Sequence, residues 1–304
     1  MSGWRILHVS GGFSVALERQ RIRVFKISSQ TVTHMPLEEI ASVIFLGGST
    51  VSTDVLAALL ASDVCLVFCG KDFLPCGMAL GLGQRFESAG RIFDQIGLAD
   101  ERKRFIWRRI VISKIRGQSR VLKGLGYEWE DLANMTLQVR LGDGRSHEAR
   151  AAKVYWSRLL AGAGRRDDSV KENAFLNYGY AIVRSVLCRA LVGSGFLTAI
   201  GVHHISRKNY FNLADDLLEI YRPLVDYAVF SSLDFLNSLD DRDVKVFLRR
   251  LPFCSISYGP DIETVQVSCR HLVRALSSIF IGSDQFHCPV FDPDVFDSGF
   301  RRSL

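Results

Sequence analysis

The sequence predicts an α+β protein, in which a small N-terminal β-sheet domain precedes a larger, all-helical C-terminal domain. Short runs rich in β-branched and aromatic residues fill the chain from Trp4 to Leu82, whereas long amphipathic segments follow Asp100. The composition, with 48% hydrophobic and 23% charged residues, is typical of a globular protein. We therefore expect the two domains to cover residues 1–95 and 96–304.

Five short strands and one or two short helices are predicted in the first domain. The expected strands are RILHVS, FSVALE, RIRVFKIS and SVIFLG, with turns at Gly11-Gly12 and Arg19-Gln20. Thr53 is expected to cap a helix over DVLAALLAS, and VCLVFC then returns as a buried strand. Because no catalytic constellation occurs here, the expected role of this domain is interaction, including dimer formation.

The second domain begins with a strongly basic segment, residues 101–123, which carries nine basic residues after Glu101 and no further acid. Apolar residues recur in it at helical spacing, and Trp107 lies among the charges. The basic face of such a helix either contacts DNA phosphates or is merely solvated, with its charge balanced by acidic residues on neighbouring helices. The candidate DNA contacts are Arg104, Arg108, Arg109, Lys114 and Arg120.

Further helices are predicted over residues 173–193, 213–239 and 243–251, and Gly193 with Gly195 ends the first of them. Asn212 is expected to cap the second, with Asp215 as the acid of a capping box. Pro223 lacks the N–H that would bond to the carbonyl of Glu219, so a bend is expected there. Residues 282–304 are weakly periodic and are expected to form a partly ordered extension.

The stretch with the clearest chemistry is GVHHISRKNYFNLADDLLEIYRPLVD. It places His203 and His204 before a helix on which Asp216 and Glu219 share a face, while Glu148 stands on a separate helix beside small residues. Carboxylate and imidazole ligands without cysteine favour Mg²⁺ or Mn²⁺ over structural zinc. The residues alone leave open an ordinary set of surface acids with a capping histidine.

Net charge and hydropathy narrow the class of protein. The formal charge of +6 suits an anionic partner, although a merely basic surface would give the same value. No apolar stretch approaches the roughly 20 residues that span a bilayer, and the N-terminus lacks a signal-peptide pattern, so we expect a cytoplasmic protein without a membrane partner. The seven cysteines form no CxxC pair and are expected to be reduced thiols.

Four segments in one order carry a family resemblance. HEARAAKVYW, NAFLNYGYAIVRS and the histidine stretch, behind STDVLAALLASDVCLVFCGKDFLPCG, together resemble the CRISPR-associated spacer-acquisition integrases, the Cas-one family, and most closely its type II branch. In that family a Glu, a His and a second acid bind the divalent metal, and the matching residues are Glu148, His204 and Glu219. Asp216 matches a supporting acid, and His203 remains an alternative ligand.

The resemblance implies a metal-dependent DNA integrase and endonuclease that joins the 3′-hydroxyl ends of a short duplex into a CRISPR repeat by transesterification. Since DNA would supply both nucleophile and leaving group, Tyr155 is expected to pack rather than to react. The resemblance also implies a homodimer, two copies of which bind a small ferredoxin-like Cas-two dimer in a hetero-hexamer, with the type II effector nuclease and a DNA-end-binding protein as further partners. Two alternatives stay open: a structure-specific nuclease that uses water, and a non-catalytic DNA-binding scaffold.

Overall fold

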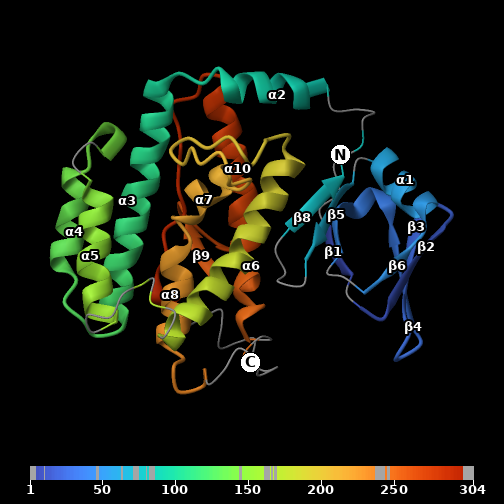
Figure 1. Cartoon of the computed structure of the whole chain (residues 1–304), viewed down its shortest axis with the longest axis horizontal. Helices are drawn as coiled ribbons and strands as arrows, with labels where there is room; N and C mark the ends of the chain where they lie inside the picture. Colours follow the sequence, from blue (N-terminus) through green and yellow to red (C-terminus); the bar gives the residue numbers. More distant parts are fainter. Residues whose placement is uncertain are drawn as a thin grey trace. The chain divides into compact units, whose positions relative to one another are not determined.

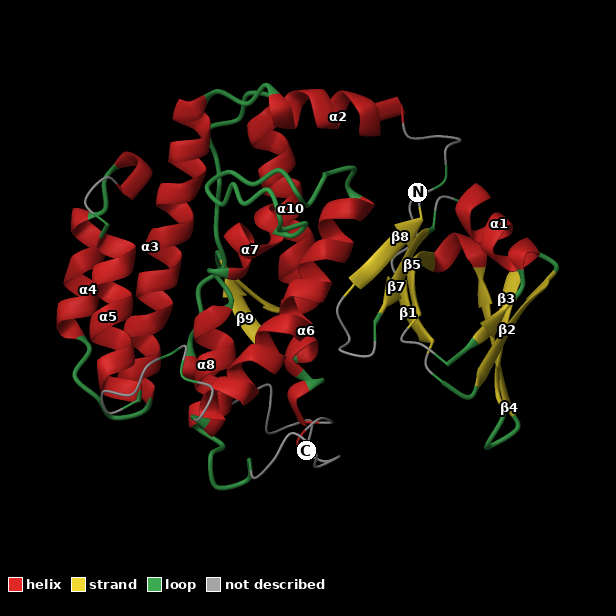
Figure 2. Cartoon of the chain, in the orientation of Figure 1, coloured by secondary structure: helices red, strands yellow, loops and turns green. Residues whose placement is uncertain are grey.

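A computed structural model of the chain describes residues 5–9, 11–45, 48–62, 64–70, 75–79, 81, 86–143, 146–160, 165, 167, 170–236, 244 and 247–296. The chain divides into two compact units, one formed by Met1–Phe93 with Leu191–Phe196 and the other by Asp94–Ala190 with Leu197–Leu304. Strands gather in the first unit and helices in the second (Figures 1 and 2), which confirms the predicted α+β class. No helix among the described residues is long and apolar enough to cross a membrane.

The first unit contains two four-stranded sheets. One has the order β1-β5-β7-β8, with the first three strands parallel and β8 antiparallel to β7. The other has the order β4-β3-β2-β6, antiparallel except that β6 runs parallel to β2. The strands are β1 (Arg5–Val9), β2 (Phe13–Glu18), β3 (Arg21–Lys26), β4 (Thr31–Pro36), β5 (Ile40–Phe45), β6 (Thr50–Val51), β7 (Cys65–Cys69) and β8 (Pro75–Ala79).

Local sequence explains the connections of this unit. Arg19 and Gln20 both have positive φ, 45° and 59°, and form the predicted two-residue turn between β2 and β3. Helix α1 (Thr53–Ala61) is capped by Ser52, whose side chain accepts a hydrogen bond from the N–H of Val55 at 3.4 Å. The predicted cap at Thr53 is wrong by one residue, because Ser52 keeps an extended backbone and Thr53 is already helical.

The second unit is mostly helical and is organised around α3, a helix of 25 residues that contacts α4, α5, α7 and α8. Its one described hairpin, β9 with β10, was not predicted, since each strand is only four residues long. The helices are α2 (Phe86–Ile96), α3 (Asp100–Gly124), α4 (Glu130–Met135), α5 (His147–Leu159), α6 (Lys171–Gly193), α7 (Asn212–Leu218), α8 (Arg222–Phe230) and α10 (Val265–Phe280), and the strands are β9 (Ser255–Tyr258) and β10 (Asp261–Thr264).

The helix predicted over residues 213–239 is broken into α7 and α8, and Pro223 stands in the first turn of α8. Between the two helices the backbone makes tighter hydrogen bonds, from the N–H of Ile220 to Leu217 at 3.2 Å and from that of Tyr221 to Leu218 at 2.8 Å, and Pro223, which has no N–H to donate, suits the first turn of α8. Helix α3 approaches this break closely. A Cβ atom on Gly117 would lie 2.7 Å from Cγ of Pro223, so the contact requires glycine.

The predicted capping of α7 is also wrong. The N-cap position is Phe211, and no side chain caps the helix there. Asn212 is instead the first helical residue, and its buried amide donates to the carbonyl oxygens of Ala199 at 2.9 Å and Ser206 at 2.8 Å. These bonds hold the preceding loop, which carries the histidines, against the start of α7.

The end of the described chain, residues 283–296, lies along α3 and is not a loose extension. Arg109 and Arg120 donate to the carbonyl oxygens of Phe286 at 3.1 Å and Phe291 at 3.2 Å, and Ser113 donates to that of Pro289 at 2.6 Å. The phenylalanine side chains at positions 286, 291 and 296 are buried. The expectation of a partly ordered extension is therefore wrong for this segment, because its aromatic residues supply a core contact; residues 297–304 lie outside the described residues.

Candidate active site

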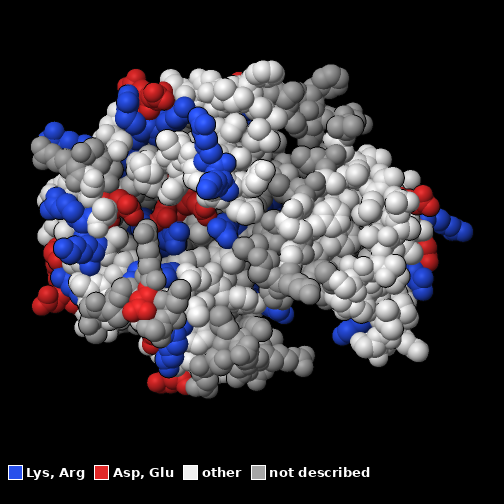
Figure 3. All heavy atoms as spheres, viewed as in Figure 1, with Lys and Arg blue, Asp and Glu red and all other residues white. Residues whose placement is uncertain are grey.

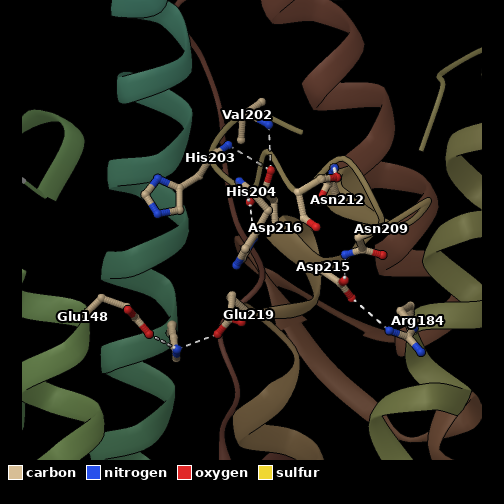
Figure 4. Close-up of polar contacts among 12 residues, drawn as sticks. Glu148, Arg184, Val202, His203, His204, Asn209, Asn212, Asp215, Asp216 and Glu219 are labelled. Atoms are coloured by element: carbon tan, nitrogen blue, oxygen red, sulfur yellow. Dashed lines mark hydrogen bonds and ion pairs between the residues drawn. The ribbon is translucent and has the colours of Figure 1, made fainter. Parts of the chain in front are cut away.

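The loop between α6 and α7 is folded around a single carboxylate. Asp216 is completely buried and accepts hydrogen bonds from the backbone N–H groups of Val202 at 2.6 Å, His203 at 3.0 Å and His204 at 3.0 Å (Figure 4). A Cβ atom on Gly201 would lie 2.7 Å from Oδ2 of Asp216, so glycine is needed for this turn. Asp216 therefore fixes the path of the loop.

The same carboxylate orients the ring of His204. Its Nδ1 lies 2.7 Å from Oδ1 of Asp216, and this hydrogen bond raises the pKa of His204 above its ordinary value although partial burial opposes the rise. When Nδ1 carries the proton, Nε2 on the far side of the ring is the acceptor nitrogen of the neutral imidazole. A carboxylate that orients a histidine in this way is common behind metal-binding imidazoles.

His203 has a different environment. Its ring stacks on the buried Trp107, with ring centroids 3.9 Å apart and planes 4° from parallel. Asp216 accepts a hydrogen bond from the backbone N–H of His203, whereas it accepts one from the N–H of His204 and also contacts its ring. The arrangement favours His204 over His203 as the ligand.

The two acids implied as ligands meet at a lysine from the central helix. Glu148 stands in the first turn of α5, and Glu219 follows α7; in Figure 4 they point toward one another from opposite sides. Lys114 of α3 is buried between them, with Nζ in contact with Oε1 of Glu148 and 2.5 Å from Oε2 of Glu219. Two carboxylates, one from α5 and one from the turn after α7, therefore converge on one cationic nitrogen.

Arg222 completes the surroundings of Glu219. Its Nε donates to Oε1 of Glu219 at 2.9 Å. Burial by itself would raise the pKa of Glu219, but the positive charges of Arg222 and Lys114 outweigh it and hold the pKa at about 2. Burial would likewise lower the pKa of Lys114, but Glu219 and Glu148 raise it above its ordinary value. Both partners consequently carry full charge at neutral pH.

A second buried carboxylate adjoins this cluster. Asp226 of α8 accepts hydrogen bonds from the hydroxyl groups of Tyr155, at 2.9 Å, and of Tyr180. Burial raises the pKa of Asp226 to about 6 although both hydroxyl groups oppose the rise. The Arg222 guanidinium lies 4.4 Å from the Tyr180 ring centroid and so joins the two clusters. Tyr155 is completely buried in this network, where it links α5 to α8.

The candidate DNA contacts on α3 are placed in different surroundings. Arg104 is exposed, whereas Arg108 donates to the carbonyl oxygen of Val139 at 2.9 Å, and Arg109 and Arg120 hold the segment 283–296. Lys114 is buried, which removes it from any exposed basic face. On the side seen in Figure 3, a row of acidic side chains crosses the helical unit with basic side chains on both sides of it.

The donor set suits a hard divalent cation in kind, since it offers two carboxylates and an oriented imidazole. The carboxylates of Glu148 and Glu219 already face one positive charge. Within the described part of the chain, however, no three His, Cys, Asp or Glu side chains lie close enough together to hold a metal ion. The space between the two carboxylates is filled by Lys114.

Sequence reasoning missed the buried role of Lys114. The signal was present in the spacing, because Lys114 follows Ile110 by four residues and precedes Val121 by seven, which puts it on the apolar stripe of the helix. Because Lys114 is one of nine basic residues in this segment, its position on the buried side of the helix is not apparent from charge alone. The role of Asp226 gave no comparable signal, since its partners come from two other helices.

Comparison with known proteins gives three consistent findings. The family model described as "CRISPR associated protein Cas1" matches residues 7–235. The "CRISPR-associated endonuclease Cas1" of Neisseria meningitidis serogroup C (strain 8013) is 35% identical over 230 residues, which cover 74% of this chain and 75% of that protein. Among solved structures, a partial Cas6-RT-Cas1–Cas2 complex matches with a TM-score of 0.71 at 20% identity, and the match covers 96% of this chain and 99% of that one. A casposase bound to its integration product matches with a TM-score of 0.67 at 17% identity, and that match covers 93% of this chain and 92% of the casposase chain.

Proposed function

The chain belongs to the CRISPR-associated Cas1 family, and on that premise we propose that it is a divalent-metal-dependent DNA integrase and endonuclease of CRISPR adaptation. The observation that carries this proposal is the convergence of Glu148 and Glu219 on one cationic centre, in a unit that also presents a carboxylate-oriented His204. The name of the Neisseria relative supports the nuclease activity. The casposase bound to an integration product, which shares the fold, is consistent with strand joining.

In this proposal Glu148, Glu219 and Nε2 of His204 hold Mg²⁺ or Mn²⁺. Such a cation, when bound, polarises a phosphodiester and neutralises the negative charge that develops on it. Asp216 keeps the proton of neutral His204 on Nδ1, which leaves Nε2 as the donor atom. Arg222 keeps Glu219 oriented and ionised, so that its carboxylate needs no proton release before it binds a cation.

The reaction we propose is strand transfer. A DNA 3′-hydroxyl attacks a phosphodiester of the repeat, one P–O bond forms, another breaks, and the leaving 3′-oxygen takes up a proton. No protein nucleophile is needed, and the complete burial of Tyr155, whose hydroxyl group donates to Asp226, agrees with a packing role. Hydrolysis by the same residues, with water as the nucleophile, is the second candidate, and the endonuclease name of the Neisseria relative favours it.

The partners we propose follow from the family. The complex that shares the fold contains Cas1 and Cas2, and a further solved neighbour is a Cas1–DNA complex. We infer that a homodimer of this chain binds duplex DNA, and that two such dimers bind a small ferredoxin-like Cas2 dimer. Association with a type II effector nuclease and a DNA-end-binding protein belongs to the same proposal.

The test uses the full-length protein with its Cas2 partner, a labelled short duplex, and a plasmid that carries a CRISPR repeat. With Mn²⁺ or Mg²⁺ we expect labelled strands longer than the substrate, and EDTA should abolish them. Glu148→Ala and His204→Ala should each reduce joining by at least about a hundredfold, whereas His203→Ala, the matched control one residue away, should retain activity within about tenfold.

The products separate the candidate functions. Labelled strands that are only shorter than the substrate would assign the protein to hydrolysis. If the folded complex yields neither longer nor shorter strands with either metal ion, the non-catalytic scaffold is the correct assignment. Equal losses in the two histidine variants would contradict the assignment of His204 as the ligand.

A further inference from the structure

We propose that Lys114 is an internal counter-ion of the candidate metal site: its ammonium group holds Glu148 and Glu219 together in the metal-free protein and moves out from between them when a divalent cation binds. This inference rests on the proposed function, because it concerns the same two carboxylates. It assigns Lys114 a positioning role that the basic sequence around it does not suggest.

The contacts explain why a positive charge is held there. Lys114 reaches the site from α3, Glu148 from α5 and Glu219 from the turn after α7, so the ammonium group joins three separate elements. The side chains of Lys114 and Glu219 are 8% and 9% exposed. Two carboxylates that face each other in such a poorly solvated place repel one another unless a cation lies between them.

The geometry also explains why the ammonium group and a metal ion exclude one another. Nζ of Lys114 is 2.5 Å from Oε2 of Glu219 and contacts Oε1 of Glu148. A Mg²⁺ ion would need those oxygen atoms at about 2.1 Å. Two cations that share the same carboxylate oxygens would lie within about 4 Å of each other, where their charges repel one another strongly in a poorly solvated site.

In this proposal the ammonium group leaves the site on the side of Glu148. Its side chain is 30% exposed, in contrast to that of Glu219 at 9%, so the site is closest to solvent there. The four-carbon stem of a lysine is flexible, so rotation about its bonds can move the ammonium group while the backbone of α3 stays in place. The exchange is one of position.

The decisive variant is Lys114→Met, which keeps the apolar stem and removes the charge. Mn²⁺ affinity is measured by calorimetry on the full-length protein, with electron paramagnetic resonance to count bound ions. Since the competing charge is gone, we expect the Kd for Mn²⁺ to fall by at least about tenfold. The melting temperature without metal should fall, and Mn²⁺ should raise it by more than in the wild type.

Two control variants isolate the position of the charge. Lys123→Met removes a lysine from the exposed surface of the same helix and should leave the Kd unchanged. Lys114→Arg keeps a positive charge between the carboxylates and should bind Mn²⁺ no more tightly than the wild type. Equal or weaker Mn²⁺ binding by Lys114→Met, with clear binding by the wild type, overturns the inference and leaves the proposed function standing.

A second measurement needs no variant and therefore does not depend on the folding of Lys114→Met. Wild-type protein is labelled with an amine-reactive ester with and without saturating Mn²⁺, and the peptides that contain Lys114 and Lys123 are quantified by mass spectrometry. Labelling of Lys114 should rise several-fold with Mn²⁺ while that of Lys123 stays constant. Constant labelling of Lys114 at saturation overturns the inference, whereas a wild type that binds no Mn²⁺ at all overturns both the inference and the metal-dependent function.

Discussion

Asp216 and Glu219 lie three residues apart, but their surroundings differ, and so do the roles that we propose for them. Asp216 accepts four hydrogen bonds from the histidine loop, three from backbone N–H groups and one from the ring of His204. It could not ligate a cation without giving up some of them. Glu219 faces Lys114 and Arg222. We therefore assign Asp216 as a positioning residue and Glu219 as the candidate ligand.

The buried Asp226 predicts an unusual dependence of stability on pH. Its pKa of about 6 in the folded protein lies above the ordinary value of 3.8, so the folded state binds the proton more tightly than the unfolded state does. The contribution of Asp226 to the free energy of unfolding should consequently be largest below pH 4. It should decrease by roughly 3 kcal/mol as the pH rises from there through 6. Urea denaturation of the wild type and of Asp226→Asn between pH 5 and 8 measures the accessible part of this change.

Since Asn cannot titrate, the Asp226→Asn variant should lose less stability over that pH range than the wild type. Asp94→Asn, a matched substitution at an exposed position of the same unit, should follow the wild-type curve. Parallel curves for the wild type and Asp226→Asn would show that the carboxyl group does not change its protonation on folding in this range.

At the level of elements, the close contact between α3 and α8 leaves no room for a side chain at position 117. Gly117→Ala gains helix propensity of about 1 kcal/mol, but its Cβ would meet the Pro223 ring at 2.7 Å and 2.9 Å. Such overpacking costs about 1–3 kcal/mol, and the ring cannot rotate away. We expect a net destabilisation of about 1 kcal/mol in urea denaturation. Gly90→Ala in α2, where nothing lies within 4 Å, should be neutral or stabilising; a stabilised Gly117→Ala protein would contradict the close packing.

Most elements of this fold could be predicted from local pattern. The turn at Arg19-Gln20 joins two alternating runs, and the end of α6 at Gly193 coincides with a glycine pair; both are set by residues close in sequence. The α7–α8 break was expected as a bend because Pro223 removes one hydrogen bond, although its full extent was not. Strands β9 and β10 were missed, since four residues are too few for periodicity to show.

The candidate site was predictable only in part. The sequence and its family resemblance indicated Glu148, His204 and Glu219, and their assignment as metal ligands stays a prediction. The ion pairs of Lys114 depend on three elements distant in sequence, and no local pattern encodes which acids a buried lysine meets. The cap assigned to Asn212 failed for the same reason, because its amide bonds to carbonyl groups of the preceding loop.

For the molecule as a whole, the structure changes which basic residues should be substituted to test DNA binding. Of the five basic residues proposed to contact DNA, only Arg104 is exposed, and Arg116 and Lys123 are further exposed cations on α3. Reversing these three to Glu should weaken DNA binding and reduce the slope of log K against log salt by about one for each phosphate that the protein no longer neutralises. An unchanged slope would mean that this face is only solvated.

Arg109→Gln serves as the contrasting variant, because Arg109 holds a backbone carbonyl of the segment 283–296. We expect it to lower the melting temperature while leaving the salt slope unchanged. The pair of variants separates weaker binding of DNA from weaker folding, which circular dichroism reports directly.

The segment 283–296, which lies along α3, also determines when the helical unit can finish folding during synthesis. Its hydrogen bonds join residues 171 to 177 positions apart in sequence, and its phenylalanine side chains fill the surface of the helical unit beside α3. Most of the first unit can fold while the rest of the chain is still on the ribosome, but α3 cannot be fully covered until residues 283–296 have emerged. Until then, apolar surface beside α3 stays open to chaperones and to other nascent chains. Nascent chains stalled before residue 283 should accordingly be more sensitive to protease in the helical unit than the released protein.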